Sequence, residues 1–424
     1  STPGAADCST QSPLTREQLL ASADAIAEEI HAHAIKEASG SVYWLGLSYV
    51  PNADRYQLQP LGASLYEGNC GIALFLAALA RIRGSSQFRD LALGAVESLR
   101  KVLQTTNAHL TQRFAKTIGI GAASGLGSVV YSLVKISQFL KEPALMEDAR
   151  GFANLITPEL IAGDQKLDVM NGAAGVILGL LTLYKETTEQ IVLDKAIACG
   201  QHLLEHRLSV EGSPRAWKTT EDQPLTGFSH GVSGIAYALL QLYAAGQDST
   251  YKEAALEGIA YERSVLSSSA ANWPDFCSSF AQQNGQPGFL VSWCHGVPGI
   301  GLGRLGALSV LETEEIHQDL ELALQTTQKY DLQGVDYLCC GNFGRLEVLL
   351  LAAQKLARPE LQELALQKAA WVVARAKQTG AYQLSANLPS HLLSPSFFQG
   401  TAGIGYELLR LAYPEVLPSV LLLE

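Results

Sequence analysis

The sequence has few charged residues and no long apolar segment, and each lack excludes a class of protein. Charged side chains make up 17% of the 424 residues, below the ~25% that is usual for globular chains. With 47% hydrophobic residues, the composition favours a large buried core over disorder. No apolar run reaches the ~18 residues that a bilayer-spanning helix needs. The first thirteen residues lack the basic start and apolar block of a signal peptide, so none is expected.

Basic residues are also in the minority. Thirty Lys and Arg against 41 Asp and Glu give a net charge of −11, which argues against a protein that binds nucleic-acid phosphates. The sequence carries no Walker motif, no protein-kinase motif and no His-Glu-x-x-His pair. Neither ATP chemistry nor a metalloprotease-type zinc site is therefore expected.

The cysteines are odd in number and do not form a disulfide framework. They are spread over a long chain and two are adjacent, whereas disulfide scaffolds are short and dense in cysteine. This distribution indicates a reducing cytoplasm, with some thiols used for metal binding or chemistry. The seven are Cys8, Cys70, Cys199, Cys277, Cys294, Cys339 and Cys340.

A glycine followed by an apolar run recurs seven times along the chain. Successive repeats are 54, 50, 59, 65, 45 and 59 residues apart, a length that accommodates two helices and two loops. In six repeats a second glycine stands three residues earlier, but in the second repeat that place holds Ala122, with Gly121 beside it. The glycines that begin the apolar runs are Gly71, Gly125, Gly175, Gly234, Gly299, Gly344 and Gly403.

The apolar runs are hydrophobic on nearly every side, as helices buried all round are. Longer amphipathic segments separate them, and the first begins with a capping box of Thr15 and Gln18. Alternation typical of β-strands is scarce. The pattern predicts an all-α protein, an (α/α)7 toroid of seven inner and seven outer helices with all glycine turns at one end. We expect one domain, residues 14–424, after a linker or flexible N-terminus at residues 1–13.

Aligning the repeats on the earlier glycine brings cysteines and histidines to one mouth of the ring. Cys294 and Cys339 stand two residues before it in neighbouring repeats, and Cys340 takes the place that His230 and His295 hold elsewhere. Three thiolates with an open fourth position are typical of a catalytic zinc site. We therefore expect one Zn2+ on these three cysteines. The alternatives are small buried hydrophobes, as most free cysteines are, and a strained disulfide between the adjacent pair.

Three turn sequences, GFSHGVSG, SWCHGVPG and LCCGNFG, resemble the signature turns of the lanthionine synthetase cyclases. They are most similar to the C-terminal cyclase domain of class II lanthipeptide synthetases, and the resemblance covers essentially the whole chain. In much of the family the third zinc ligand is a histidine in a Cys-His-Gly turn. Here Cys339-Cys340-Gly341 is similar to the three-cysteine subgroup typified by the prochlorosin synthetase. The resemblance implies an (α/α) toroid with a central zinc.

The resemblance further implies intramolecular thioether formation. The thiol of a peptide cysteine adds to the β-carbon of a dehydroalanine or dehydrobutyrine and closes a lanthionine or methyllanthionine ring. His230 is implied as acid or base, oriented by Asp168 of the DVMNGAAG segment, and His295 as a group that positions the enolate oxygen. Each residue also has a purely structural alternative. His230 would be a hydrogen-bonded histidine without a catalytic part, Asp168 would only cap its turn, and His295 would only shape the pocket.

Other positions carry weaker expectations. Some relatives have an arginine shortly before the first zinc cysteine; residues 289–291 are apolar here, and Arg304 on the next inner helix is a candidate substitute. By repeat phase, Glu67 and Asp336 are expected to point toward the mouth and to contact peptide or solvent. His202, on an outer helix, is expected on a solvated face.

The resemblance also implies partners. Class II relatives make the dehydroamino acids with an N-terminal dehydratase domain, which nothing here resembles, and the chain begins with Ser. We expect the excised cyclase half of a bifunctional, cytoplasmic bacterial synthetase that acts on a dehydrated precursor peptide, leader plus core, without nucleic acid or a membrane span. A stand-alone cyclase is the alternative. Two other functions stay open: an enzyme that adds glutathione to dehydroamino acids, and a non-enzymatic, zinc-containing scaffold that binds peptides.

Overall fold

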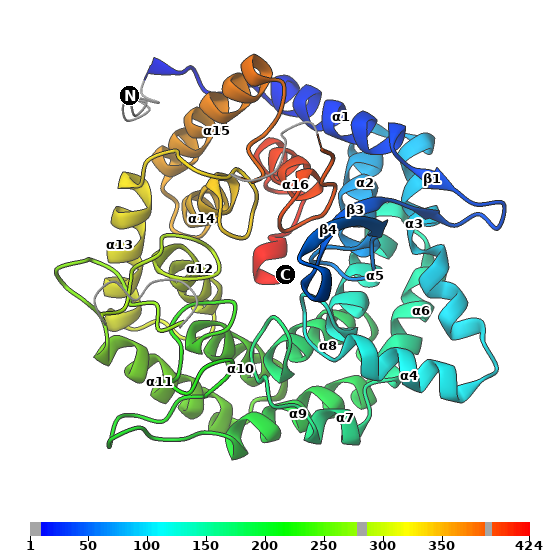
Figure 1. Cartoon of the computed structure of the whole chain (residues 1–424). Helices are drawn as coiled ribbons and strands as arrows, with labels where there is room; N and C mark the ends of the chain where they lie inside the picture. Colours follow the sequence, from blue (N-terminus) through cyan, green and yellow to red (C-terminus); the bar gives the residue numbers. More distant parts are fainter. Residues whose placement is uncertain (1–9, 278–285, 386–391) are drawn as a thin grey trace.

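Helices alternate along the chain between an inner and an outer ring (Figure 1). The computed structural model describes residues 10–277, 286–385 and 392–424, and fourteen of the sixteen α-helices in these residues belong to the two rings. The inner helices are α2 (Asn69–Arg83), α5 (Leu126–Leu140), α8 (Ala173–Thr187), α10 (Val232–Gly246), α12 (Val297–Ala307), α14 (Asn342–Lys355) and α16 (Thr401–Ala412). The outer helices are α1 (Arg16–Ala32), α3 (Ser86–Gln104), α6 (Pro143–Asn154), α9 (Gln190–Glu205), α11 (Ser249–Ser264), α13 (Glu314–Lys329) and α15 (Pro359–Thr379).

The ring is closed by its two ends. Each inner helix packs against the next, and α16 packs against α2. The first outer helix, α1, covers the last inner helix, α16, so segments from opposite ends of the chain complete the circle. The predicted (α/α)7 toroid is therefore confirmed.

The two kinds of helix differ as their sequences predict. In α2 every residue from Asn69 to Ala80 is buried, because the helix lies between its outer partner and its two ring neighbours. In α3 the buried residues include Phe88, Leu91 and Ala95, which share one face. The capping box of Thr15 and Gln18 is present at the start of α1. Outer helices thus bury one stripe, whereas inner helices bury their whole surface.

The structure corrects the alignment of the second repeat. The N-cap of α5 is Gly125, which corresponds to Gly68 at the start of α2. Gly125 is therefore the earlier glycine of its repeat, and Ser128 stands where the other repeats have the later one. The Ser128 hydroxyl donates to the Gly125 carbonyl at 2.7 Å, so a serine fits this place. The residues before the cap are Ala123 and Ser124.

Several smaller elements were not predicted. Helices α4 (Ala108–Ile118) and α7 (Pro158–Ala162) extend the outer ring. One antiparallel hairpin pairs β1 (Ile35–Lys36) with β2 (Val42–Tyr43). A second pairs β3 (Leu45–Val50) with β4 (Arg55–Pro60), and the short helix η2 (Pro51–Ala53) lies between its two strands. The β3–β4 hairpin lies toward the centre of the ring in Figure 1. No helix among the described residues has the length and apolarity that a membrane crossing requires. Residues 1–9 of the predicted linker lie outside the described residues.

The C-terminal segment lies near the centre of the ring (Figure 1). It includes the short helix η3 (Val420–Leu422), whose backbone carbonyls accept hydrogen bonds from side chains around the ring. The Tyr237 hydroxyl donates to Leu422 O at 3.0 Å, and the Trp293 indole donates to Leu421 O at 3.2 Å. Because Trp293 immediately precedes Cys294, this central segment also supports the glycine-turn end of the ring.

Candidate metal centre and catalytic site

A closed circle of backbone hydrogen bonds joins the seven glycine turns. The residue two positions before each N-cap glycine donates its N–H to the carbonyl of its counterpart in the next repeat, with N···O distances of 2.9 to 3.3 Å. The circle holds the backbone next to the residues that stand one position before each N-cap glycine, which include His230, His295 and Cys340. Its members are Tyr66, Ala123, Met170, Ser229, Cys294, Cys339 and Phe398, which donates back to Tyr66.

Two of the three predicted ligands are neighbours in this circle, since the Cys294 N–H donates to Cys339 O at 3.2 Å. The turn that follows Cys294 depends on Gly296, whose φ is +92°, a region that L side chains rarely adopt. A Cβ at this position would lie 1.8 Å from the Leu290 carbonyl oxygen. Glycine is thus required for the chain to pass directly from a cysteine ligand into helix α12.

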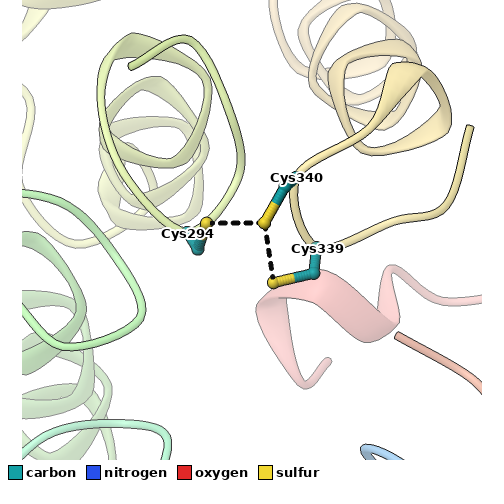
Figure 2. A group of neighbouring side chains, drawn as sticks. All are labelled: Cys294, Cys339 and Cys340. Carbon is teal, nitrogen blue, oxygen red and sulfur yellow. Dashed lines mark hydrogen bonds between the residues drawn. The ribbon is translucent and has the colours of Figure 1, made fainter. Parts of the chain in front are cut away.

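The structure brings Cys294, Cys339 and Cys340 together (Figure 2). The Sγ of Cys340 lies 3.3 Å from that of Cys294 and 3.4 Å from that of Cys339, and all three sulfurs lie within 4.8 Å of one another. Cys294 and Cys339 are buried, while Cys340 is exposed. Three sulfur atoms from two neighbouring turns could therefore hold one metal ion at the mouth of the ring.

The three sulfurs differ in how readily they lose a proton, and Cys340 is the one that favours the thiolate. Hydrogen bonds with Cys294 and Cys339 lower the pKa of the Cys340 thiol to about 4. Hydrogen bonds with the other two sulfurs, together with burial, raise the pKa of Cys339. The Tyr66 hydroxyl donates to Cys339 Sγ at 3.2 Å, and the Ser292 hydroxyl lies 3.2 Å from Cys294 Sγ. A cluster that already holds a thiolate, with hydroxyls around it, is suited to a soft cation.

Arg345 joins the two turns that carry the cysteines. Its Nη1 donates to Val291 O at 2.9 Å and to Cys340 O at 3.4 Å, and its Nη2 donates to Asn342 Oδ1 at 2.7 Å. The buried guanidinium also lies over the ring of Tyr330, 4.6 Å from the centroid. Sequence reasoning missed this residue. The signal that could have found it is an arginine within an otherwise apolar inner-helix run.

Arg304, the candidate substitute for the family arginine, does not lie at the mouth. Its Nη2 donates to Glu262 Oε1 at 2.7 Å and its Nε donates to Asp319 Oδ2 at 3.1 Å. All three side chains are almost completely buried. The arginine holds α12 to helices α11 and α13, so its side chain is engaged away from the mouth and does not substitute for the family arginine.

His230 and Asp168 form a pair one repeat away from the cluster. His230 Nδ1 lies 2.7 Å from Asp168 Oδ2, and Asp168 Oδ1 accepts the backbone N–H of Asn171 at 2.7 Å. The aspartate is fully buried, whereas the histidine side chain is 26% exposed. Burial lowers the pKa of His230, but the hydrogen bond and charge of Asp168 outweigh it and raise the pKa above the ordinary value. The predicted orientation of His230 by Asp168 thus has a geometric basis.

His295 lies on the cluster side of His230. The two ring centroids are 6.2 Å apart, and His295 Nδ1 lies 3.6 Å from Asp275 Oδ1. The His295 side chain is almost completely buried, and its backbone N–H donates to Ser292 Oγ at 3.2 Å. His295 thus lies near His230 and is adjacent to Cys294 in the chain, a location compatible with either role considered for it.

Two weaker expectations are wrong and a third is partly met. Asp336 is fully buried and accepts hydrogen bonds from Arg375 and from the Gln383 backbone N–H, so it is enclosed among protein groups and does not point into the mouth. His202 is buried, and its Nε2 lies 2.7 Å from Asp164 O, because the outer helix covers the loop before α8. Glu67 does line a cavity at the mouth.

Comparisons with known proteins agree with this geometry. A model of the lanthionine synthetase C-like protein family matches residues 59–422. The protein named glutathione S-transferase LANCL1 of Danio rerio is 26% identical over 281 residues, which are 63% of this chain and 62% of that relative. The match thus spans less than two thirds of the relative.

Solved structures share the toroid. Nisin cyclase has a TM-score of 0.60 and 18% identity, covering 85% of this chain and 92% of that one. A family 76 α-mannanase of Bacteroides thetaiotaomicron has a TM-score of 0.52 and 14% identity, covering 95% of this chain and 97% of that one. At these identities the likenesses establish the fold alone.

Proposed function

The chain belongs to the lanthionine synthetase C-like family, and on that premise we propose that it is a zinc-dependent lanthipeptide cyclase. It adds cysteine thiols of a dehydrated peptide to dehydroalanine or dehydrobutyrine residues of the same peptide. The observation that carries the proposal is the cluster of three cysteines at the mouth, beside a His–Asp pair. We assign residues 14–424 to this cyclase domain and place it in the three-cysteine subgroup of the family.

The donor set suits zinc. Thiolates are soft ligands that select zinc over hard cations, and a tetrahedral centre with ~2.3 Å Zn–S bonds separates its sulfurs by ~3.8 Å. The three sulfurs, all within 4.8 Å of one another, are compatible with that spacing. Three protein ligands would leave one position for the substrate sulfur, and Cys340 is the exposed member of the three. When bound there, zinc would keep the substrate thiol deprotonated near neutral pH.

The remaining chemistry falls to His230. Attack of the thiolate on the β-carbon moves the double-bond electrons onto the α-carbon and its carbonyl, and that enolate needs a proton. The Nδ1 of His230 is hydrogen-bonded to Asp168. The Nε2–H of the imidazolium is therefore the acid that protonates the α-carbon. The proton lost by the thiol restores the imidazolium, so the ring closes without a change of mass.

A competition with glutathione tests the activity. We expect a synthetic peptide with one cysteine and one dehydroalanine to lose its free thiol without a change of mass, even when glutathione is present in excess. The reason is that the peptide thiol and alkene enter the mouth together. Mass spectrometry after thiol alkylation distinguishes the cyclised peptide from a glutathione adduct. A predominant adduct would favour the activity named for the Danio rerio relative, and closure no faster than without protein would favour a scaffold.

Arg345 offers a test of the metal centre itself. With a substrate thiolate bound, the formal charge of the centre would be +2 − 4 = −2, and the Arg345 cation adjoins Cys340. We expect Arg345→Met to weaken zinc binding by about 10- to 100-fold, as loss of groups around metal ligands typically does. Arg345→Lys should recover part of the affinity, because it keeps the charge but not the planar fork.

Zinc affinity for these variants would be measured by competition with a chromophoric chelator. The matched control is Arg358→Met, which removes a surface arginine that pairs with Glu321 and Glu360. Its zinc affinity should equal that of the unmodified chain. Equal affinity in Arg345→Met would show that the guanidinium has no part in holding the metal.

A further inference from the structure

A cavity of about 390 Å³ lies at the glycine-turn end of the ring. Its walls are the β3–β4 hairpin, the turn before α2 and the segments before α14 and α16. Glu67 and Gln399, which line it, each stand one residue before an N-cap glycine. His230, His295 and Cys340 hold the same position in other repeats. The cavity is therefore another sector of the mouth that contains the cysteine cluster.

Two tyrosines connect the cavity to the sulfurs. Tyr337 lines the cavity and stands two residues before Cys339 in the same turn. Tyr66 adjoins Glu67, stacks on Phe398 with the ring centroids 4.9 Å apart, and donates to Cys339 Sγ at 3.2 Å. The turns that carry Glu67 and Tyr337 thus border both the cavity and the sulfur cluster.

The hairpin presents an apolar face to its surroundings. The register pairs Leu45 with Pro60, Leu47 with Leu58 and Tyr49 with Tyr56, and residues that pair or alternate along a strand share a face. We call this set the apolar row: Leu45, Leu47, Tyr49, Tyr56, Leu58 and Pro60.

The apolar row is unusually exposed for its composition. Leu58 is 62% exposed, Tyr56 55% and Tyr49 50%, whereas the opposite face carries polar residues such as Ser48 and Gln57. An isolated two-stranded hairpin is only marginally stable in water, so displaying its apolar side is costly unless that side binds something. Leu47, a member of the row, also lines the cavity, which makes the row and the cavity one continuous surface.

We propose that the cavity and the apolar row form a subsite for an extended, apolar segment of the peptide substrate, adjoining the cysteine that reacts. The inference rests on the proposed function, because the occupant is the same peptide. A strand-like segment would place alternate side chains on the row, while Glu67, Gln383 and Gln399 offer hydrogen-bonding groups to its backbone. The cavity volume lies within the ~300–1,000 Å³ usual for binding pockets.

The test compares two synthetic peptides with the same Cys-Gly-Gly-dehydroalanine unit. One carries Val-Tyr-Ile-Leu extensions on both sides, and the other carries Gly-Ser-Gly-Ser extensions. The quantity measured is the ratio of their kcat/KM values for cyclisation in three zinc-loaded proteins. These are the unmodified chain, the double variant Tyr56→Ser/Leu58→Ser, and the control Leu110→Ser/Ile191→Ser. The control alters residues that are 51% and 59% exposed on helices α4 and α9.

We expect the apolar extensions to raise kcat/KM by about 10-fold or more in the unmodified chain and in the control, and by less than about 2-fold in the hairpin variant. An equal gain in all three proteins, or no gain in the unmodified chain, would overturn the subsite. If neither peptide cyclises, the proposed function fails, and the subsite is judged separately. Fluorescence anisotropy of the labelled apolar peptide, with serine in place of cysteine, must then show weaker binding to the hairpin variant alone; equal binding to all three overturns the subsite.

Discussion

Cys339→Ala is expected to reduce the zinc content from about one ion per chain to below about 0.1 and to abolish cyclisation above the spontaneous rate. Two thiolates fall short of the three protein ligands that a catalytic zinc site uses. Cys339 is a firmly held candidate ligand, since it is buried, belongs to the backbone circle and accepts a hydrogen bond from the Tyr66 hydroxyl. Elemental analysis of freshly purified, reduced protein measures the zinc, and mass spectrometry measures ring closure.

The matched control for this experiment is Cys199→Ala. Cys199 is fully buried in the outer helix α9, and burial raises the pKa of its thiol, so it behaves as a small core side chain. Its replacement is expected to cost about 1 kcal/mol of stability and to leave the zinc content near one. Full zinc in Cys339→Ala would remove this cysteine from the ligand set. Zinc loss in both variants, with unchanged circular dichroism, would place the metal elsewhere.

Much of the fold follows from the repeat in the sequence. A helix that is apolar on every side must lie inside a layer of other helices, and seven such helices at regular intervals form a ring. The cysteines could be placed for the same reason, because equivalent positions in successive repeats meet at one mouth. The backbone circle explains why this argument works: it holds Cys294 and Cys339 at equivalent points of adjacent turns.

What the sequence did not reveal depends on contacts between residues far apart in the chain. Ser128 replaces the glycine that marks the other repeats and so displaced the alignment by three residues. Asp336 has the repeat phase of a mouth residue, but Arg375, from the outer helix α15, encloses it. Arg345 belongs to an apolar run, and its role depends on the carbonyl of Val291 in another turn. Periodicity indicates which face a residue occupies, not which partner meets it there.

The hairpin illustrates a different limit. Its residues largely alternate between polar and apolar as those of a half-buried strand would, yet the two strands belong to a chain dominated by helices. Because the apolar row is exposed, the pattern in the sequence does not report burial in this chain. It reports an exposed surface, for which we propose the peptide substrate as the complement.

Loss of the acid is the second large effect that the site predicts. His230→Asn is expected to slow cyclisation by about 10²- to 10⁴-fold, the range usual for a positioned proton donor. The zinc content should remain near one, because His230 contributes no ligand to the sulfur cluster. The control is His317→Asn, since His317 is an exposed histidine that pairs with Glu312 on the outer surface. A full rate in His230→Asn would assign the proton transfer to another group, with His295 the nearest candidate.

Asp168→Asn tests the same assignment through its pH dependence. The reaction needs His230 protonated, so the rate falls as the pH rises through its pKa. Burial alone lowers that pKa, and the hydrogen bond and charge of Asp168 raise it above the ordinary ~6.5. Removing the carboxylate therefore moves the alkaline limb of kcat/KM to lower pH. The same pair also contributes to the stability of the fold. Because the pKa of His230 is higher in the folded than in the unfolded chain, this contribution is fully present below the unfolded pKa and is lost as the pH rises through the folded pKa. If the alkaline limb of Asp168→Asn coincides with that of the unmodified chain, while zinc stays bound across the range, His230 is not the titrating acid.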